Sequence, residues 1–332
     1  MVTYLEDLQD GLHALFAEDE RVYLLGEDVL DPYGGAFKVV KGLSSAYPQR
    51  VMTTPISEAG IVGVATGMAL RGLRPIVEIM FGDFLTLTAD QLVNYATKFR
   101  AMYDGQVSVP LVVRTPMGGG RGYGPTHSQT LEKLFLGVPH LRIVAPSLYH
   151  RPGELLRHAT LNDDGVVLFL EHKLLYPARL VTEDMPPAYV ETRAGIAGYP
   201  TMLIRNFERG KPDVTVICYG GASLLVHPLL ERLADEEIRV LVCAPGCIQP
   251  LPVGDLLDAA RATGRVVIVE EGTRAFGWGA EVAATLAAEM SLDSPVRRVA
   301  ALDTVIPAAQ ALERLALPSS QAVEAAIYEA LA

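Results

Sequence analysis

Short apolar runs alternate along the chain with longer segments of helical periodicity. In the first half, the apolar runs predict strands at residues 22–25, 76–79, 111–114, 142–145 and 166–171. Between them, apolar positions at helical spacing predict helices over 4–17, 57–71, 87–102 and 152–162. This alternation is typical of a parallel sheet covered by helices, so we predict one α/β unit for the first half.

The pattern loses its periodicity between Tyr176 and Pro212, where prolines and charged residues gather. Beyond this stretch, strands are predicted at 214–219, 240–243 and 266–270, with helices over 224–234, 255–263, 280–289 and 320–331. This second series has the size of a smaller α/β domain. We therefore predict a first domain over 1–180, a linker over 181–212 and a second domain over 213–332.

Composition narrows the class of protein. The 332 residues are 50% apolar and carry 28 basic against 39 acidic side chains, and the net charge of −11 does not favour nucleic acid as a partner. The apolar runs fall far short of the ~20 residues that span a bilayer, and no basic segment precedes an apolar one at the amino terminus. The cysteines do not supply a complete zinc site. We expect a cytoplasmic protein that does not enter a membrane.

A carboxylate stands at the start of the most apolar of the predicted helices. The motif Thr-Pro-Ile-Ser-Glu ends at Glu58, and residues 61–70 after it are almost all apolar or small. An acid in a first helical turn usually does no more than complement the helix dipole. A helix this apolar is expected to be buried, however, which would place Glu58 at the mouth of a core.

A glycine-rich loop follows the predicted strand at 111–114 and leads to a histidine. It runs Gly-Gly-Gly-Arg-Gly-Tyr-Gly-Pro over 118–125, before Thr126 and His127. The loop has neither the G-x-G-x-x-G spacing of dinucleotide sites nor the Gly-Lys pair of a P-loop, so its glycines indicate close approach to a ligand or a partner chain. A lone loop histidine is usually a surface residue, and Glu27, after the strand at 22–25, is by default a solvated acid.

Several motifs, in order, resemble the beta subunits of pyruvate, branched-chain 2-oxo acid and acetoin dehydrogenases. They are Gly-Glu-Asp-Val at 26–29, Gly-Gly-Ala-Phe at 34–37, Thr-Pro-Ile-Ser-Glu at 54–58 and His-Ser-Gln at 127–129. Weaker matches, such as Glu-His-Lys at 171–173 and Glu-Glu-Gly-Thr-Arg at 270–274, extend the resemblance over nearly the whole chain. The resemblance implies an α/β fold in which a pyrimidine-binding parallel-sheet domain precedes a smaller transketolase C-terminal-like domain.

By this resemblance the chain is an oxidoreductase subunit acting on the oxo group of a 2-oxo acid. The enzyme would decarboxylate the acid with thiamine diphosphate and pass the acyl group to a lipoyl group. The expected assembly is an alpha2beta2 heterotetramer whose alpha subunit holds the diphosphate and its magnesium ion, and a lipoyl acyltransferase is a further expected partner. The Gly-Asp-Gly motif that binds this metal in the family is absent from the sequence. The chain alone is therefore expected to be inactive.

The resemblance also assigns roles to single residues. Glu58 matches the carboxylate that hydrogen-bonds the aminopyrimidine, so that the cofactor can act as its own base. His127 matches a histidine that faces the substrate or the lipoyl sulfur and exchanges a proton near neutral pH. Phe84 matches an aromatic residue that packs on the pyrimidine ring, and Glu27 is expected in the same cofactor site. Family members also bind potassium through main-chain oxygens, which fall here on Leu111, Ala159, Thr160, Asn162 and Asp164.

Two segments depart from the family pattern. Residues 242–246 lack the Asp and Arg that family members commonly have after the corresponding strand, here the one predicted at 240–243. The loop at 118–125 lacks the apolar, alanine-rich character expected near His127 in pyruvate and branched-chain enzymes. The substrate and the acyl acceptor therefore stay open. A carboligase or a non-oxidative decarboxylase subunit is the alternative function, and a non-catalytic scaffolding subunit is a third, against which Glu58 and His127 both argue.

Overall fold

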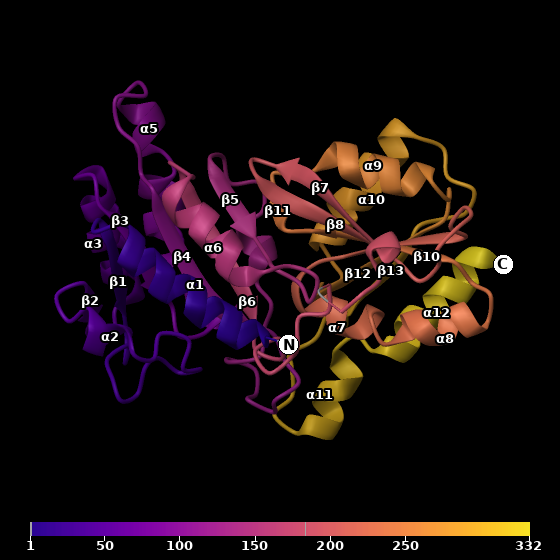
Figure 1. Cartoon of the computed structure of the whole chain (residues 1–332), viewed down its shortest axis with the longest axis horizontal. Helices are drawn as coiled ribbons and strands as arrows, with labels where there is room; N and C mark the ends of the chain where they lie inside the picture. The colour runs from indigo at the N-terminus through magenta and orange to yellow at the C-terminus, as the bar shows by residue number, and fades with distance from the viewer. Residues whose placement is uncertain (1, 183) are drawn as a thin grey trace.

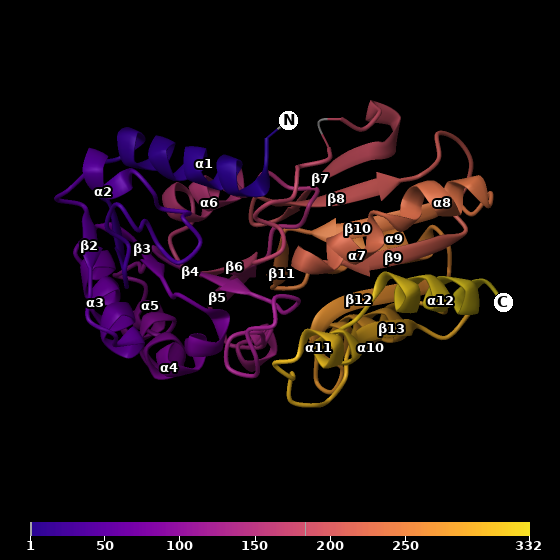
Figure 2. The same ribbon diagram turned by 90° about the horizontal axis from the view of Figure 1, so that it is seen from below.

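The two halves of the chain form two α/β units that lie side by side. The computed structural model describes residues 2–182 and 184–332. In Figure 1 the first half, indigo to magenta, lies beside the second half, orange to yellow, and the amino terminus lies near their junction. Each half has one principal sheet with helices on both faces, as Figure 2 shows. The predicted α/β fold class is therefore confirmed.

The first sheet has seven strands in the order β11-β5-β6-β4-β3-β1-β2. Its strands are β1 (Val22–Gly26), β2 (Val51–Thr53), β3 (Arg74–Glu78), β4 (Leu111–Met117), β5 (Leu141–Val144), β6 (Val166–His172) and β11 (Cys247–Gln249). All neighbouring pairs are parallel except β11 and β5. Strands β4 and β6 are buried along their whole length, because helices cover both faces of the sheet.

Two layers of helices cover this sheet. On one face lie α1 (Tyr4–Glu18) and α6 (Pro152–Leu161), and on the other lie α3 (Glu58–Leu70), α4 (Leu85–Asp90) and α5 (Phe99–Met102). The helix predicted over 87–102 is interrupted, because α4 passes into a π-helical segment, η2 (Gln91–Ala96), before α5. The Thr97 hydroxyl donates to the carbonyl of Leu92, five residues earlier, over 2.9 Å and accompanies this wider turn.

The second sheet has six strands in the order β13-β12-β9-β10-β8-β7. Its strands are β7 (Val190–Ile196), β8 (Tyr199–Arg205), β9 (Val214–Cys218), β10 (Val240–Pro245), β12 (Val266–Thr273) and β13 (Arg297–Ala301). One face packs on α9 (Val253–Arg261) and α10 (Trp278–Glu289), and the other on α7 (Ser223–Val226), α8 (Leu229–Asp235) and α12 (Ser320–Leu331). A further helix, α11 (Gln310–Ala316), lies towards the first half of the chain.

The remaining elements are short. They are α2 (Leu43–Ala46), η1 (Gly82–Phe84), η3 (Glu132–Leu134), η4 (Pro187–Tyr189) and η5 (Gly220–Ala222). Among the described residues, no helix has both the length and the apolar character needed to cross a membrane.

The stretch 181–212, which we predicted to be a linker, contributes two strands to the second sheet. Strands β7 and β8 pair antiparallel with each other, and β8 pairs antiparallel with β10. Strand β7 lies at the edge of the sheet, and its residues are partly buried or exposed. Polar and charged side chains are therefore tolerated there, and they interrupt the apolar pattern by which a strand is predicted.

The two halves share a continuous core. Strand β11 lies in the second half of the sequence but pairs with β5 of the first sheet. Leu141 and Ile143 of the first half belong to the same buried cluster as Ile248 and Trp278 of the second. The placement of one half relative to the other is thus fixed by buried packing as well as by the chain connection.

Candidate active site

The site residues predicted from the sequence follow strands that end at one edge of the first sheet. Glu58 follows β2, Glu27 follows β1, Phe84 follows β3, and His127 lies in the loop after β4. Because the strand order is β4-β3-β1-β2, the ends of these strands lie three strand steps apart at most, about 14 Å at ~4.8 Å for each step. Ligands of open α/β sheets bind at such carboxyl ends.

Two acids lie close together at one end of this edge. Glu58 is the first residue of α3 and is buried, and Glu27 is buried as well. Burial raises the pKa of Glu27, and the nearby charges of Glu58 and Asp28 raise it further, against a hydrogen bond from the Ser57 amide. One oxygen of Glu27, Oε1, is buried and has no hydrogen-bond partner among the described residues. Buried polar atoms are normally satisfied, so this oxygen marks a place for a hydrogen-bonding ligand.

His127 stands in an aromatic setting further along the edge. Its ring lies edge-on to Phe81, with centroids 4.7 Å apart, and edge-on to Phe84, with centroids 5.3 Å apart. The Nδ1 atom lies 3.0 Å from the hydroxyl oxygen of Thr126. The structure thus brings His127 and Phe84 into one cluster, and Phe84 is only partly buried.

Sequence reasoning missed a buried lysine beneath this cluster. Lys173 is fully buried, and its Nζ donates to the carbonyl oxygen of His127 and lies 5.3 Å from the centre of the Phe81 ring. Burial lowers its pKa to about 8, although the charges of Asp83 and Glu271 oppose this. The sequence signals were its place in the Glu-His-Lys match at 171–173 and its position two residues after the predicted strand at 166–171, but neither indicated burial, since a lysine is by default an exposed residue.

A buried ion triad ties together the ends of the three central strands. Arg114 on β4 donates from Nε to Glu171 on β6 over 2.6 Å, and its Nη1 donates to Glu78 on β3. Tyr176 donates its hydroxyl to the same Glu171 over 2.6 Å. Arg114 has 1% of its surface exposed, so the pairing takes place away from water. The triad lies just before the loops that carry Phe84, His127 and Lys173.

The glycine-rich loop approaches the second half of the same chain. Gly118 has a φ of +93°, and a Cβ there would lie 2.0 Å from the ring of His172. A Cβ on Gly119 would lie 2.5 Å from Leu317, which follows α11. We predicted that these glycines approach a ligand or a partner chain, whereas the close approaches of Gly118 and Gly119 are made within this chain, to His172 and to Leu317.

The residues expected to bind potassium lie at the opposite edge of the sheet. Leu111 begins β4, Ala159 and Thr160 lie in the last turn of α6, and Asn162 and Asp164 follow it. Arg74 already donates from Nη1 to the carbonyl oxygens of Thr160, over 2.7 Å, and of Asp163, over 3.2 Å. Any cation there would share an acceptor with a guanidinium group.

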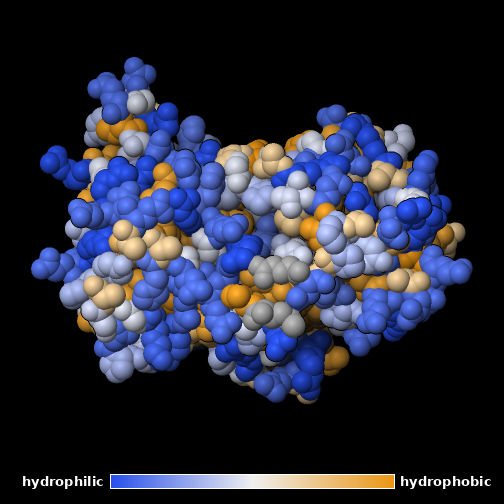
Figure 3. Space-filling model, in the orientation of Figure 1, coloured by the Kyte–Doolittle hydropathy of each residue, from blue (hydrophilic) through white to orange (hydrophobic). Residues whose placement is uncertain are grey.

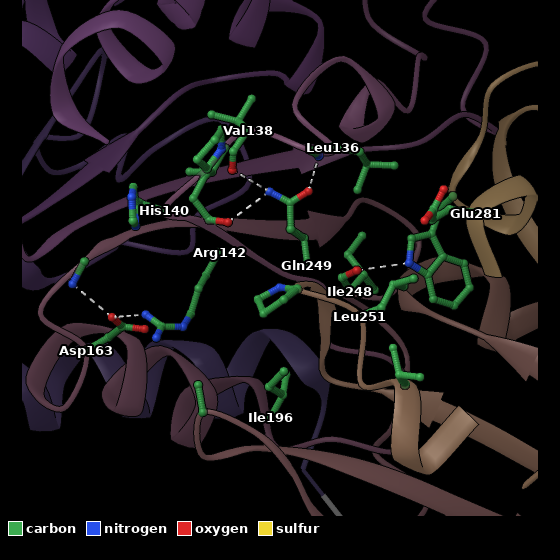
Figure 4. A pocket seen from close by; sticks show the side chains of 18 of the residues that line it. Leu136, Val138, His140, Arg142, Asp163, Ile196, Ile248, Gln249, Leu251 and Glu281 are labelled. Atoms are coloured by element: carbon green, nitrogen blue, oxygen red, sulfur yellow. Dashed lines mark hydrogen bonds and ion pairs between the residues drawn. The ribbon is translucent and has the colours of Figure 1, made fainter. Parts of the chain in front are cut away.

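A large cavity lies elsewhere in the molecule. It has a volume of about 1550 Å³ and is lined by residues near α5 and β5 and by residues of β11 and α10. Gln249, labelled in Figure 4, lines this cavity, and its Nε2 donates to the carbonyl oxygens of Val138 and Leu141 over 3.1 and 3.0 Å. In Figure 3 the surface is hollowed between the protruding α5 and the second half. None of Glu27, Glu58, Phe84 or His127 lines this cavity, so it is separate from the candidate active site.

Helix α3 is not wholly buried, contrary to the expectation from its apolar sequence. Val64 is 59% exposed, and Gly60 and Gly67 lie on the same open side. Ile56, just before the helix, is 82% exposed. An open apolar face of this kind, next to the buried Glu58, is typical of a surface that a partner covers.

Each half of the chain matches a known protein family. Residues 1–179 match the family model described as the transketolase pyrimidine-binding domain, and residues 205–323 match the transketolase C-terminal domain. A solved structure titled "Split gene transketolase, inactive beta4 tetramer" covers 100% of this chain, and the chain covers 99% of it, with a TM-score of 0.76. Its sequence identity is 21%, so this likeness concerns the fold alone.

Curated relatives extend over nearly the whole length. The pyruvate dehydrogenase E1 component subunit beta-1, mitochondrial, of Arabidopsis thaliana is 36% identical over 96% of this chain and 86% of its own length. The 2-oxoisovalerate dehydrogenase subunit beta of Bacillus subtilis (strain 168) is 35% identical over 99% of this chain and 98% of its own. The resemblance drawn from the motifs is thereby confirmed, and the chain belongs to the family of 2-oxo acid dehydrogenase E1 beta subunits, with a transketolase-like fold.

Proposed function

We propose that the chain is the beta subunit of a thiamine-diphosphate-dependent 2-oxo acid dehydrogenase, decarboxylating and acyl-transferring, that works only with an alpha subunit. The observation that carries this proposal is the pair of buried acids, Glu58 and Glu27, beside an open apolar face. A carboxylate held in this way, next to a surface that needs a covering chain, suits a cofactor bound between two subunits.

The residues present fit the aminopyrimidine part of the cofactor. Glu27 Oε1 and Thr54 Oγ1 are buried atoms that lack partners among the described residues, and Phe84 offers a partly exposed aromatic ring at the same edge. When bound, thiamine diphosphate supplies a carbon nucleophile and an electron sink for decarboxylation. Everything else must come from the protein.

Glu58 would accept a hydrogen bond from a pyrimidine nitrogen. Its buried position makes that bond stronger than it would be in water, since the local dielectric constant is lower. The pKa of Glu27 is raised first by burial and then by the nearby charge of Glu58, and a hydrogen bond from a ligand nitrogen would offset both effects. We therefore assign Glu58 to proton placement on the cofactor and Glu27 to its support.

His127 would exchange a proton with the substrate or the acyl acceptor. Because its Nδ1 is engaged by Thr126, we assign Nε2 as the exchanging atom. Phe81 and Phe84 both contact the ring in T-shaped arrangements and so fix its orientation. This arrangement supports a role in chemistry more than in packing.

The alpha subunit would cover α3 and complete the site, in an alpha2beta2 heterotetramer. Exposed apolar residues continue from α3 to Leu87 and Tyr95, which suits a large subunit contact. Among the described residues there is no group of three acidic, histidine or cysteine side chains able to hold a metal. Binding of magnesium by the alpha subunit is part of this proposal. A lipoyl acyltransferase as acceptor, potassium at the carbonyl oxygens near Thr160, and a cytoplasmic location remain parts of this proposal.

The test is reconstitution. The chain alone, the alpha subunit alone and the co-purified complex are assayed for decarboxylation of pyruvate and branched 2-oxo acids, with and without thiamine diphosphate and magnesium. We expect activity in the complex only, dependent on the cofactor and coupled to a lipoyl acceptor. Activity of the lone chain, or a complex that ignores the cofactor, would overturn the proposal. Turnover without any lipoyl acceptor would instead favour the carboligase or non-oxidative alternative.

A further inference from the structure

A carboxylate of the second domain holds the glycine-rich loop of the first. Glu313, on the inner side of α11, is 1% exposed. Its Oε1 accepts the backbone N–H of Gly120 over 2.9 Å, and its Oε2 accepts that of Gly122 over 2.8 Å. Each oxygen thus takes one amide from a loop that lies more than 190 residues away in the sequence. Charge-assisted bonds of this kind are stronger than those between neutral groups.

The fit between loop and helix depends on glycine. Gly120 and Gly122 both have positive φ angles, +87° and +70°, which turn their amides towards one acceptor. A Cβ on Gly122 would lie 2.9 Å from Gln310 at the start of α11. A side chain at these positions would therefore move the loop away from Glu313.

A second carboxylate contacts the chain on both sides of His127. Glu271 at the end of β12 accepts the N–H of Gly119 over 2.8 Å and the hydroxyl of Thr130 over 3.1 Å. His172 completes this cluster with Nε2 at 2.7 Å. His127 lies between Gly119 and Thr130, so its place is set from both sides by contacts with the second domain.

We propose that Glu313, assisted by Glu271, is a positioning residue that sets the place of His127 through the glycine-rich loop. It touches neither substrate nor cofactor and acts through the backbone. The catalytic part of this inference rests on the function proposed above for His127, whereas the hold on the loop does not. The second domain would thus be needed for the geometry of a site that is otherwise built by the first.

The substitution Glu313→Gln tests the hold at nearly constant size. A carboxamide can accept from one loop amide only, because its NH₂ group would face the other N–H. Glu313→Asp keeps the charge but shortens the reach and should be intermediate. Glu289→Gln, an exposed acid on α10, is the matched control.

Two measurements on the complex with the alpha subunit decide the question. Hydrogen exchange of peptides covering residues 118–130 should be at least about tenfold faster in Glu313→Gln, since the loop opens more readily. The kcat for the 2-oxo acid should fall by about 10- to 100-fold, the scale of a 1 Å misplacement, with thiamine diphosphate affinity unchanged. In a His127→Ala background the same substitution should change kcat by less than about twofold, because residues that act as a unit are not additive.

Unchanged loop exchange in Glu313→Gln would overturn the hold. A fall in kcat that persists undiminished in the His127→Ala background would show that Glu313 does not act through His127. If the unaltered complex shows no decarboxylation, the proposed function fails, while the exchange measurement still decides whether Glu313 holds the loop.

Discussion

Removing the charge at Arg114 should destabilise the first domain strongly. The substitution Arg114→Met leaves Glu78 and Glu171 in a site where the arginine has 1% of its surface exposed. Breaking a buried ion pair by removing one partner costs about 3–5 kcal/mol, because the remaining charge is uncompensated. At about 2–4 °C per kcal/mol for a domain of this size, the thermal midpoint should fall by about 6–20 °C.

The loss of stability in Arg114→Met should increase with pH. Burial raises the pKa of Glu78, and the guanidinium of Arg114 opposes this rise. Without the guanidinium the folded-state pKa of Glu78 rises further, which favours its protonated form in the fold. A raised folded-state pKa means that stability is retained at low pH and lost as pH rises through that pKa. The deficit of Arg114→Met should therefore be larger at pH 8 than at pH 6.

Thermal and urea unfolding, followed by circular dichroism, measure this deficit. Arg157→Met is the matched control, because the pair of Arg157 with Glu18 is exposed to solvent and should contribute little. Adding Glu78→Gln and Glu171→Gln to Arg114→Met should restore part of the stability, since no unpaired buried charge remains. A single variant that unfolds within about 1 kcal/mol of the unaltered protein at pH 8 would refute the reasoning.

Three further outcomes follow from single contacts. Thr3→Ala removes the capping box of α1 and should lower the free energy of unfolding by about 1 kcal/mol, as measured in urea; no change would show that the cap is dispensable. Burial raises the pKa of Cys218 and of Cys247 to about 12 and also raises that of Cys243, so a thiol reagent at pH 8 should label none of them before unfolding. Burial lowers the pKa of His150 to about 4. The stability that the neutral His150 side chain contributes should therefore be complete above pH 6.5 and decline as the pH falls towards 4, and a His150 imidazole resonance that titrates near pH 6.5 would contradict this.

Much of the fold could be predicted because its central strands are continuous apolar runs. Strand β2 was missed since it has only three residues, and β13 since it begins with two arginines. Helix α11 was missed because two of its apolar residues, Leu312 and Leu315, are exposed rather than part of a core-facing pattern.

Sequence patterns indicated some residues of the candidate site and not others. The positions of Glu58 and His127 after strands could be predicted because each belongs to a short motif at a strand end, and their roles stay predictions. Lys173 and Glu313 could not, because a charged residue in a sequence indicates exposure, and only the tertiary structure buries both. Glu313, the partner of the glycine-rich loop, lies more than 190 residues away in the sequence, where local patterns carry no information.

The central claim is that Glu58 acts on the cofactor at an interface with an alpha subunit. The most direct test is the decarboxylation rate of the complex carrying Glu58→Gln, with Glu289→Gln as control and with the assembly checked by size. The account predicts a fall of about 100-fold or more, the scale of a lost proton-transfer group, in a complex that still assembles. A complex with Glu58→Gln that keeps more than half of its activity would contradict it.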